Sequence, residues 1–411
     1  MPEFRTRQIM FNYRRFSVNH DGNIAIVSAL AILPVIMAAG AAVDYLGSYE
    51  LRTSLQSAVD SAALASASSP DEGIDSKKAL ASSFFHQSSG FSDITPETAV
   101  SADTVQVSVA TTSKTSFLSL GGITELPVNV TATATVISKP VCLLSLNKTA
   151  SQAIKIWGSS AHVKADDCVV HANSASPSAL DSSSGGISTA EVFCATGGYS
   201  GSNFDPTPKT GCRQVKDPYA GLPVPTYAGC DFNNVSISTG TVTLTPGVYC
   251  GGLGIGSANV TLAPGLYIMA DGEFKVSGTS ADISGTGITI YLNGNSSAVS
   301  ITGGARITLT ASATGPYAGL LFVQNPAYGS SLTSKINGHS QVKLVGAGYF
   351  PTQTLSVGGS GNFGVLSPYM TFVADIVELH GNGKITMNFD PAAAGFSNTV
   401  PREFWGVRLI N

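Results

Sequence analysis

The hydrophobic pattern of the chain begins with an uncharged run of 22 residues, Gly22–Val43, between Asp21 and Asp44. A helix of this length spans about 33 Å at about 1.5 Å per residue, which is enough to cross a hydrocarbon core of about 30 Å. Basic residues precede the run, namely Arg5, Arg7, Arg14 and Arg15. Because positive flanks stay in the cytoplasm, the pattern predicts a bacterial inner-membrane protein with a single pass, a cytoplasmic tail at 1–21, a transmembrane helix at 22–43 and a large periplasmic part. A cleaved signal peptide is the alternative, but its apolar region is usually only about 7–15 residues long.

A helical period continues beyond the apolar run. Small and apolar residues recur at 4-3-4-3 spacing, at Leu51, Leu55, Ala58, Ala62 and Ala65. The spacing predicts a helical stalk over 44–69 with a narrow seam of small side chains. Two interpretations of this seam stay open, because it could receive another helix or could pack against the protein's own outer domain.

Two segments of strict alternation follow the stalk. Residues 104–109 and 128–136 place an apolar side chain at every second position, which is typical of strands with one buried face. A short helix around Lys78–His86 is the natural cover for that face. The pattern therefore predicts a small α+β connector module over 78–139, without a site of its own.

Beyond Pro140 the chain breaks into short apolar pieces punctuated by glycine, and internal repeats become the useful signal. Residues 243–249 recur at 261–267, an offset of 18. A second pattern, apolar-x-Gly-x-x-x-apolar-x-apolar, begins at Ile301, Ile336, Val357 and Leu379, with a looser copy at Ile156. Offsets near 20 residues suit the coils of a parallel β-helix, which stack apolar rows and turn corners at glycine. The chain is therefore predicted to be mainly β, with a parallel β-helix over 140–400.

Cysteine usage adds a compartment to this picture. All six cysteines lie in one window, 142–250, and none forms a CxxC pair; they are Cys142, Cys168, Cys194, Cys212, Cys230 and Cys250. An even number without CxxC pairs indicates disulfides in an oxidising compartment and leaves the pairing open. This agrees with a periplasmic location for everything after Asp44.

Charge excludes one class of partner. Charged residues make up 12% of the chain and the net charge is −4, while glycine reaches 44 residues. Such a chain offers no basic field for phosphates, so we expect no nucleic-acid partner.

The order of features near the N-terminus carries a resemblance. The apolar run, Asp44, Arg52 and the segment 55–65 together resemble the N-terminal signature of TadE/TadG-like proteins of Flp (tight adherence) pilus assembly, and the chain is closest to TadG. The signature residues are Asp44, Arg52, Leu55, Gln56, Ala58, Asp60, Ala62, Ala63 and Leu64. The resemblance implies a role in building or anchoring Flp pili, with other pilus-assembly proteins and pilin as partners.

The chain offers only weak candidates for a catalytic or metal site. The carboxylates of the repeat region do not recur at coil spacing and are interpreted as solvated acids; they are Asp271, Glu273, Asp282, Asp375, Glu378 and Asp390. A cluster near Cys168 matches no familiar zinc spacing; it comprises His162, Asp166, Asp167, Cys168 and His171. We therefore expect no catalytic residue, no cofactor and no metal.

Three hypotheses for the function remain. The first is a membrane-anchored, non-enzymatic component of Flp pilus biogenesis that acts through its extracytoplasmic β-helix. The alternative is an envelope or surface glycan-binding protein of adhesion, whose candidate stacking residues are Trp157, Tyr199, Tyr219 and Tyr227. The third, a polysaccharide hydrolase or lyase, would require carboxylates that converge in a groove.

Overall fold

A computed structural model describes residues 22–69, 73–101, 103–329, 331–338, 341–359, 362–396 and 402–410. The predicted cytoplasmic tail at 1–21 lies outside the described residues. The chain divides into two compact units, one formed by residues 138–405 and the other by the residues before and after them. The chain passes between the units twice, through strand β3 (Glu125–Ser145) and through strand β25 (Arg402–Ile410).

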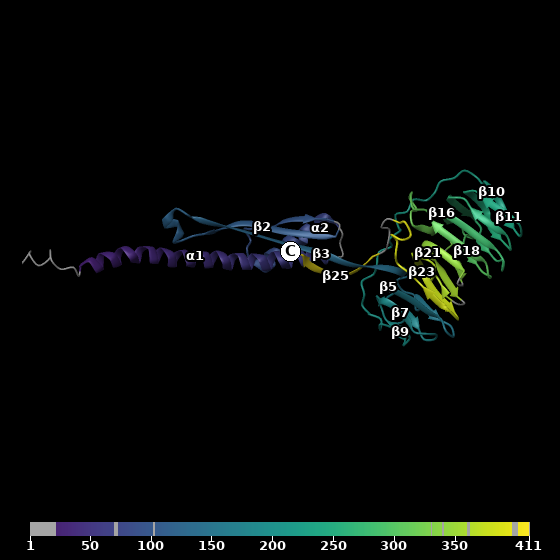
Figure 1. Ribbon diagram of the computed structural model, residues 1–411, viewed down its shortest axis with the longest axis horizontal. Coiled ribbons are helices and arrows are strands. Elements are labelled where there is room, and N and C mark those ends of the chain that lie inside the picture. Colours follow the sequence, from purple (N-terminus) through teal and green to yellow (C-terminus); the bar gives the residue numbers. More distant parts are fainter. Residues whose placement is uncertain are drawn as a thin grey trace, which may run out of the picture. The chain divides into compact units, whose positions relative to one another are not determined.

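The first unit is built on one long helix, α1 (Gly22–Ala67), which runs without a break through the apolar run, Pro34 and the predicted stalk. A shorter helix, α2 (Ile74–Ser89), follows it. Strands β1 (Glu97–Val100), β2 (Thr104–Lys114) and β3 then form an antiparallel sheet with β2 in the centre. Figure 1 shows this sheet alongside the C-terminal part of α1, while the N-terminal part of the helix extends beyond it.

The core of the first unit follows the alternation along β2 and β3. Val105, Val107 and Val109 of β2 are buried with every second residue of β3 from Val128 to Ala134. They pack against the C-terminal half of α1 and against Phe85 of α2. Val407 and Leu409 from β25 also pack on this core, so the first unit is completed by the last residues of the chain.

The N-terminal part of α1 has no such cover. Its large apolar side chains between Ile26 and Val43 are all exposed, and this segment is long and apolar enough to cross a membrane.

The second unit is a parallel β-helix, which confirms the predicted fold class. Its strands begin with the end of β3 and continue as β4 (Ile154–Trp157), β5 (His162–Ala172), β6 (Leu180–Ser182), β7 (Ser188–Ala195), β8 (Tyr199–Gly201), β9 (Phe204–Asp205), β10 (Phe232–Ile237), β11 (Thr241–Leu244), β12 (Gly247–Ile255), β13 (Asn259–Leu262), β14 (Gly265–Ala270), β15 (Phe274–Val276), β16 (Asp282–Asn293), β17 (Val299–Ile301), β18 (Arg306–Ala311), β19 (Leu320–Gln324), β20 (Thr333–Gly338), β21 (Val342–Gly359), β22 (Asn362–Phe363), β23 (Met370–Gly381) and β24 (Lys384–Thr386). Each strand pairs in parallel with the strand one coil away.

The coils do not stack in chain order. The first coil, residues 141–165, pairs on one side with the coil at 169–190 and on the other with the last coil, at 370–386. From 169–190 the chain winds on to 192–205, and residues 206–231 then connect to β10 without a strand. From β10 successive coils wind back until β23 reaches the first coil. The chain thus enters and leaves the β-helix in the middle of the stack.

The predicted repeats coincide with this stacking. The residues that open the copies of the second pattern stack in one inner column, and three residues of earlier coils continue it. The column runs through Ile237, Ile255, Val276, Ile301, Ile336, Val357, Leu379 and Ile156. The glycines of the pattern lie at a crowded corner, since a Cβ added to Gly158 would lie 2.3 Å from the carbonyl oxygen of Gly381. One position departs from the pattern: Val365 is exposed, because the chain turns at Gly364, with φ of +82°, directly after β22.

Candidate functional site

The first candidate site joins Asp44 to the loop between β2 and β3, residues 115–124, which we call the hairpin tip. The Asp44 carboxylate accepts hydrogen bonds from the backbone N–H groups of Ser116 (2.9 Å), Phe117 (2.8 Å) and Leu118 (2.7 Å). Ser116 and Phe117 precede the short 3-10 helix Leu118–Gly121, and Leu118 is its first residue. N–H groups at the start of a helix lack a partner within it, and here one charged side chain satisfies them. The first charged residue after the apolar run therefore fixes a loop more than seventy residues away.

The other signature residues form the core beneath the sheet. Leu55, Ala58, Ala62 and Ala63 are buried against β2, β3 and α2, with Leu64 partly buried beside them. Their small size lets the helix approach the sheet closely. These residues therefore pack against strands and a helix of the same chain, within the first unit.

Two polar signature residues lie at the edge of this core. The Gln56 side-chain amide donates to Asp60 (2.8 Å) and to the backbone carbonyl of Thr131 on β3 (3.1 Å). This pair ties the helix to the sheet through both side chain and backbone. Arg52 lies on the exposed side of α1.

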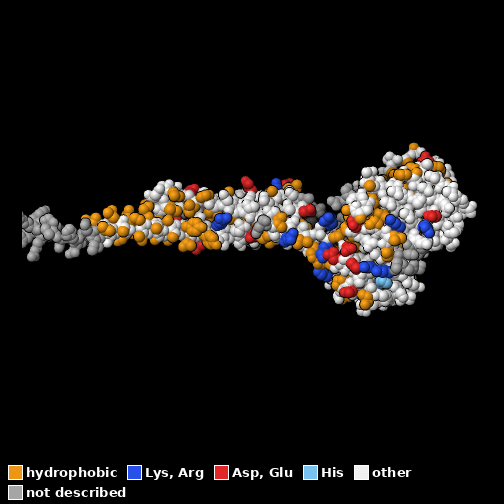
Figure 2. Space-filling model, in the orientation of Figure 1, with side chains coloured by type: hydrophobic (Ala, Val, Ile, Leu, Met, Phe, Trp, Pro, Cys, Tyr) orange, Lys and Arg blue, Asp and Glu red, His pale blue; other side chains and the backbone are white. Residues whose placement is uncertain are grey.

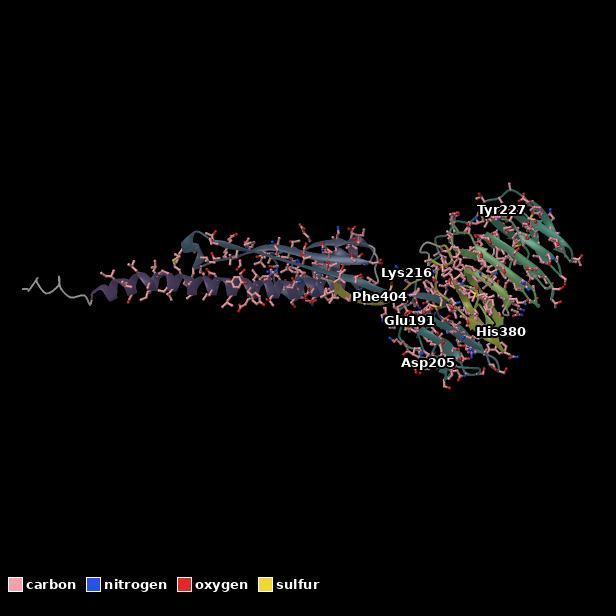
Figure 3. All side chains as sticks on the ribbon, viewed as in Figure 1. Glu191, Asp205, Lys216, Tyr227, His380 and Phe404 are labelled. Carbon is pink, nitrogen blue, oxygen red and sulfur yellow. A yellow bond between two sulfur atoms is a disulfide. The ribbon has the colours of Figure 1, made fainter. Side chains whose placement is uncertain are left out.

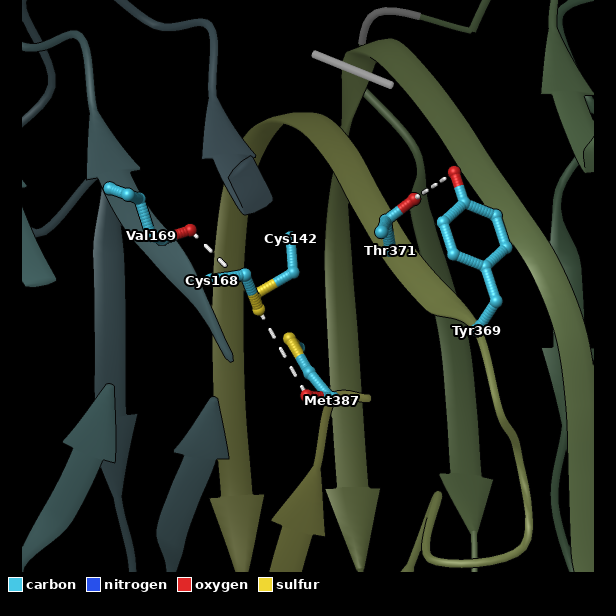
Figure 4. The surroundings of a disulfide bond; sticks show 6 residues. All are labelled: Cys142, Cys168, Val169, Tyr369, Thr371 and Met387. Carbon is cyan, nitrogen blue, oxygen red and sulfur yellow. Dashed lines mark hydrogen bonds between the residues drawn. A yellow bond between two sulfur atoms is a disulfide. The ribbon is translucent and has the colours of Figure 1, made fainter. Parts of the chain in front are cut away.

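The six cysteines form three disulfides between consecutive partners: Cys142–Cys168, Cys194–Cys212 and Cys230–Cys250. The first is buried inside the β-helix and joins neighbouring coils beside Met387 (Figure 4). The other two each hold one end of residues 206–231, which we call the crossing segment. Cys212 is held to β7 and Cys230 to β12, so both ends of a segment without strands are covalently fixed.

The crossing segment covers a second apolar core on the outside of one β-helix face. Tyr219 is buried there against Tyr349, with ring centroids 5.2 Å apart, and the Tyr349 hydroxyl donates to Asp217 at 2.8 Å. The Tyr317 hydroxyl donates to the Pro223 carbonyl at 2.6 Å. Burial raises the pKa of the Tyr219, Tyr317 and Tyr349 hydroxyls, because the anion would lose its hydration.

The first residues of β25, up to Trp405, belong to the second unit and pack there through aromatic and charged side chains. Trp405 lies between Lys139, with Nζ 4.2 Å from the ring centroid, and Lys209, at 3.9 Å. Arg213 lies over the ring of Phe404, which is labelled in Figure 3. Two residues before Trp405, Glu403 is buried and pairs with the buried His171 at 3.2 Å. No sequence pattern indicated this pair, because its members are separated by more than two hundred residues.

Four of the five residues considered as a metal cluster have other partners, and the first of them, His162, lies 3.1 Å from the backbone carbonyl of Ser160. Cys168 is in a disulfide, and Asp166 accepts from Thr189 at 2.7 Å and pairs with Lys164 at 3.2 Å. The Thr189 hydroxyl, followed by Lys164, lowers the pKa of Asp166. His171 and Glu403 lie close to Cys194, but that sulfur is bonded to Cys212 and supplies no thiolate. The donor set therefore does not suit a metal ion.

The candidate carboxylates are also dispersed. Glu378 has Ser356 and Lys155 as its neighbours on adjacent coils, and Asp282 has Asn259 and Arg306. Asp375 accepts from the Asn147 side chain, with both of its oxygens 3.1 Å away. In the registers of the described strands, none of the six candidates is paired with another.

The four aromatic candidates divide by exposure. Tyr219 is buried in the outer core, and Tyr227 accepts a hydrogen bond from Asn293 at 2.6 Å. Tyr199 packs edge-on against Phe204. Tyr199, Tyr227 and Trp157 are exposed to similar fractions, 37%, 40% and 42%. Trp157 also stacks on His380 of the neighbouring coil, with ring centroids 5.3 Å apart.

Comparison with known proteins gives one match. Residues 22–69 match the model of the family described as Putative Flp pilus-assembly TadE/G-like. No curated protein and no solved structure matches the chain. The match covers α1, which contains the predicted signature residues from Asp44 to Leu64. Over these residues the chain is therefore TadE/G-like, which confirms the predicted resemblance and supports an involvement in Flp pilus assembly.

Proposed function

We propose that the protein is a non-enzymatic, membrane-anchored component of Flp pilus biogenesis and that its β-helix contacts other pilus-assembly proteins or pilin from the periplasmic side. The observation that carries the proposal is the match of residues 22–69 to a pilus-assembly family. The matched residues include both the apolar segment and the half of α1 that forms the core of the first unit.

Two further observations support the orientation. Basic residues precede the apolar run, which favours a cytoplasmic N-terminus. Three disulfides in the second unit suit an oxidising compartment. Both favour a location of the β-helix outside the cytoplasm.

The unit boundaries give a sharp test of what the β-helix contributes. In a strain that lacks the gene, surface pili would be counted by electron microscopy after restoration with the full chain or with a deletion variant. The variant replaces residues 138–405 by a short Gly/Ser linker and keeps 406–411, because Val407 and Leu409 belong to the first unit's core. Immunoblots of membrane fractions would confirm equal amounts of both proteins.

We expect pili only with the full chain. Pili restored by the linker variant would show that the β-helix is dispensable for assembly. Pilus numbers unchanged in the deletion strain itself would overturn the proposal.

Glycan binding is a second candidate, and one observation favours it. Trp157 is exposed on a face of the β-helix whose neighbouring outward residues, Lys155, Glu378 and His380, are polar. An exposed aromatic ring among polar side chains is a surface on which a sugar can stack. Binding of isolated envelope polysaccharide to the purified protein, lost in Trp157→Ala, would support this function, and equal binding by the variant would contradict it.

A further inference from the structure

The hairpin tip exposes an unusual set of side chains. Phe117, Leu120 and Ile123 are 40%, 79% and 49% exposed, and no charged residue occurs between Thr115 and Thr124. Among the large apolar side chains that the structure describes, Leu120 has the highest exposed fraction. Apolar side chains gathered on a loop without charge point to an apolar partner.

The tip is held at a defined level of α1. Asp44 binds three of its backbone N–H groups, as described above. Four residues earlier, Gly40 lies directly under the Phe117 ring, since a Cβ added to Gly40 would lie 2.4 Å from Phe117 Cγ. The tip therefore sits on residues 40–44 of the helix.

Residues 40–44 are also where the apolar run ends. A span of 22 residues from Gly22 brings Val43 to the outer boundary of the hydrocarbon core. Tyr45 and Tyr49 follow on α1 with exposed rings, as is typical of the membrane interface. In Figure 2 apolar side chains cover both the N-terminal part of α1 and the loop beside it.

We propose that the hairpin tip inserts Phe117, Leu120 and Ile123 into the outer interface of the bilayer that α1 spans. The bilayer is favoured over a protein partner because the apolar surface of the tip is continuous with that of the membrane-spanning helix. The Asp44 carboxylate then satisfies backbone N–H groups of a turn that lies where little water is present to bind them. A second contact beside the helix fixes the rotation and tilt of α1, and with them the direction of the first unit. This contact is independent of the proposed pilus function.

The proposal can be tested with a fluorescent label on the full chain in lipid nanodiscs. The variant Leu120→Cys introduces a single free thiol, because all six native cysteines are in disulfides. The matched control is Ser101→Cys, in the connection between β1 and β2 at the end of β2 opposite the tip; the 11 residues of β2 alone span roughly 36 Å. Both thiols receive a polarity-sensitive dye, and the nanodiscs carry phosphatidylcholine and phosphatidylglycerol with or without a nitroxide-labelled acyl chain.

We expect blue-shifted emission and strong nitroxide quenching for the dye at Leu120, and neither effect at Ser101. Equal, water-like emission at both positions would overturn the proposal. Emission that is shifted at Leu120 but not quenched by the labelled lipid would also overturn it, because a protein surface would then cover the tip. A label at Ile123→Cys repeats the measurement and guards against a local effect of one substitution.

Discussion

At the scale of single residues, Asp44 shows why an acid follows the apolar run. Its carboxylate accepts three backbone hydrogen bonds from the hairpin tip. In Asp44→Ala we expect the amides of Ser116, Phe117 and Leu118 to exchange hydrogen about tenfold faster, as for a loop that loses hydrogen bonds to a charged group. Hydrogen exchange with mass spectrometry in detergent micelles measures this rate. Thr53→Ala, which loses one exposed bond within α1, is the control, and equal exchange in both variants would contradict the assigned role.

Residue patterns predicted that the cysteines form disulfides and that the helix resembles a family, but they did not predict which distant residues bond to each other. The cysteines and the signature were identifiable because each has a local spacing. The bonds of Asp44 to the tip, and of His171 to Glu403, join residues that are distant in the chain, and nothing in the local pattern selects one distant partner over another. For the alanine seam the sequence left two partners open, because small side chains suit a foreign helix and a nearby sheet equally well.

At the scale of elements, the crossing segment depends on covalent ties because it has no strands of its own. The double variant Cys194→Ser/Cys212→Ser removes a link with a sequence separation of 18, for which chain entropy predicts a loss of about 3 kcal/mol in the free energy of unfolding. We expect a lower melting temperature and faster trypsin cleavage at Lys209, Arg213 and Lys216. Cys230→Ser/Cys250→Ser is the matched control, since it frees the other end of the segment, beyond these sites. Unchanged cleavage in the first variant would mean that the outer core alone holds this part of the chain.

Element types were more predictable than element order. The offset of 18 and the pattern that opens at Ile301 reflect true coils, since Thr243 pairs with Thr261 and Ile301 with Ile336. The sequence could not show that the first coil stacks on the last, because Ile156 and its partner Leu379 lie near opposite ends of the β-helix sequence. The looser copy of the pattern at Ile156 was the one sequence feature that pointed to this stacking, because Ile156 follows Leu379 in the same inner column.

At the scale of the whole molecule, buried tyrosines link the coils of the β-helix to each other and to the crossing segment. Tyr249 and Tyr267 stack with ring centroids 5.8 Å apart, and their hydroxyls donate to backbone carbonyls at the corners. Burial raises the pKa of Tyr249 from 10.0 to about 12 and raises those of Tyr267, Tyr291 and Tyr349 further. The folded state therefore holds these hydroxyls neutral where the unfolded chain would ionise them.

These raised pKa values make the free energy of unfolding fall at alkaline pH. Below pH 10 both states keep these phenols protonated, so the tyrosines leave the free energy of unfolding unchanged with pH. Between pH 10 and about 12 the unfolded chain releases protons that the folded chain retains, so stability falls as pH rises. We expect the circular dichroism of the β-helix to be lost in this window together with a step in tyrosinate absorbance at 295 nm. A full absorbance change near pH 10 with the circular dichroism intact would show that the tyrosine hydroxyls are in contact with water.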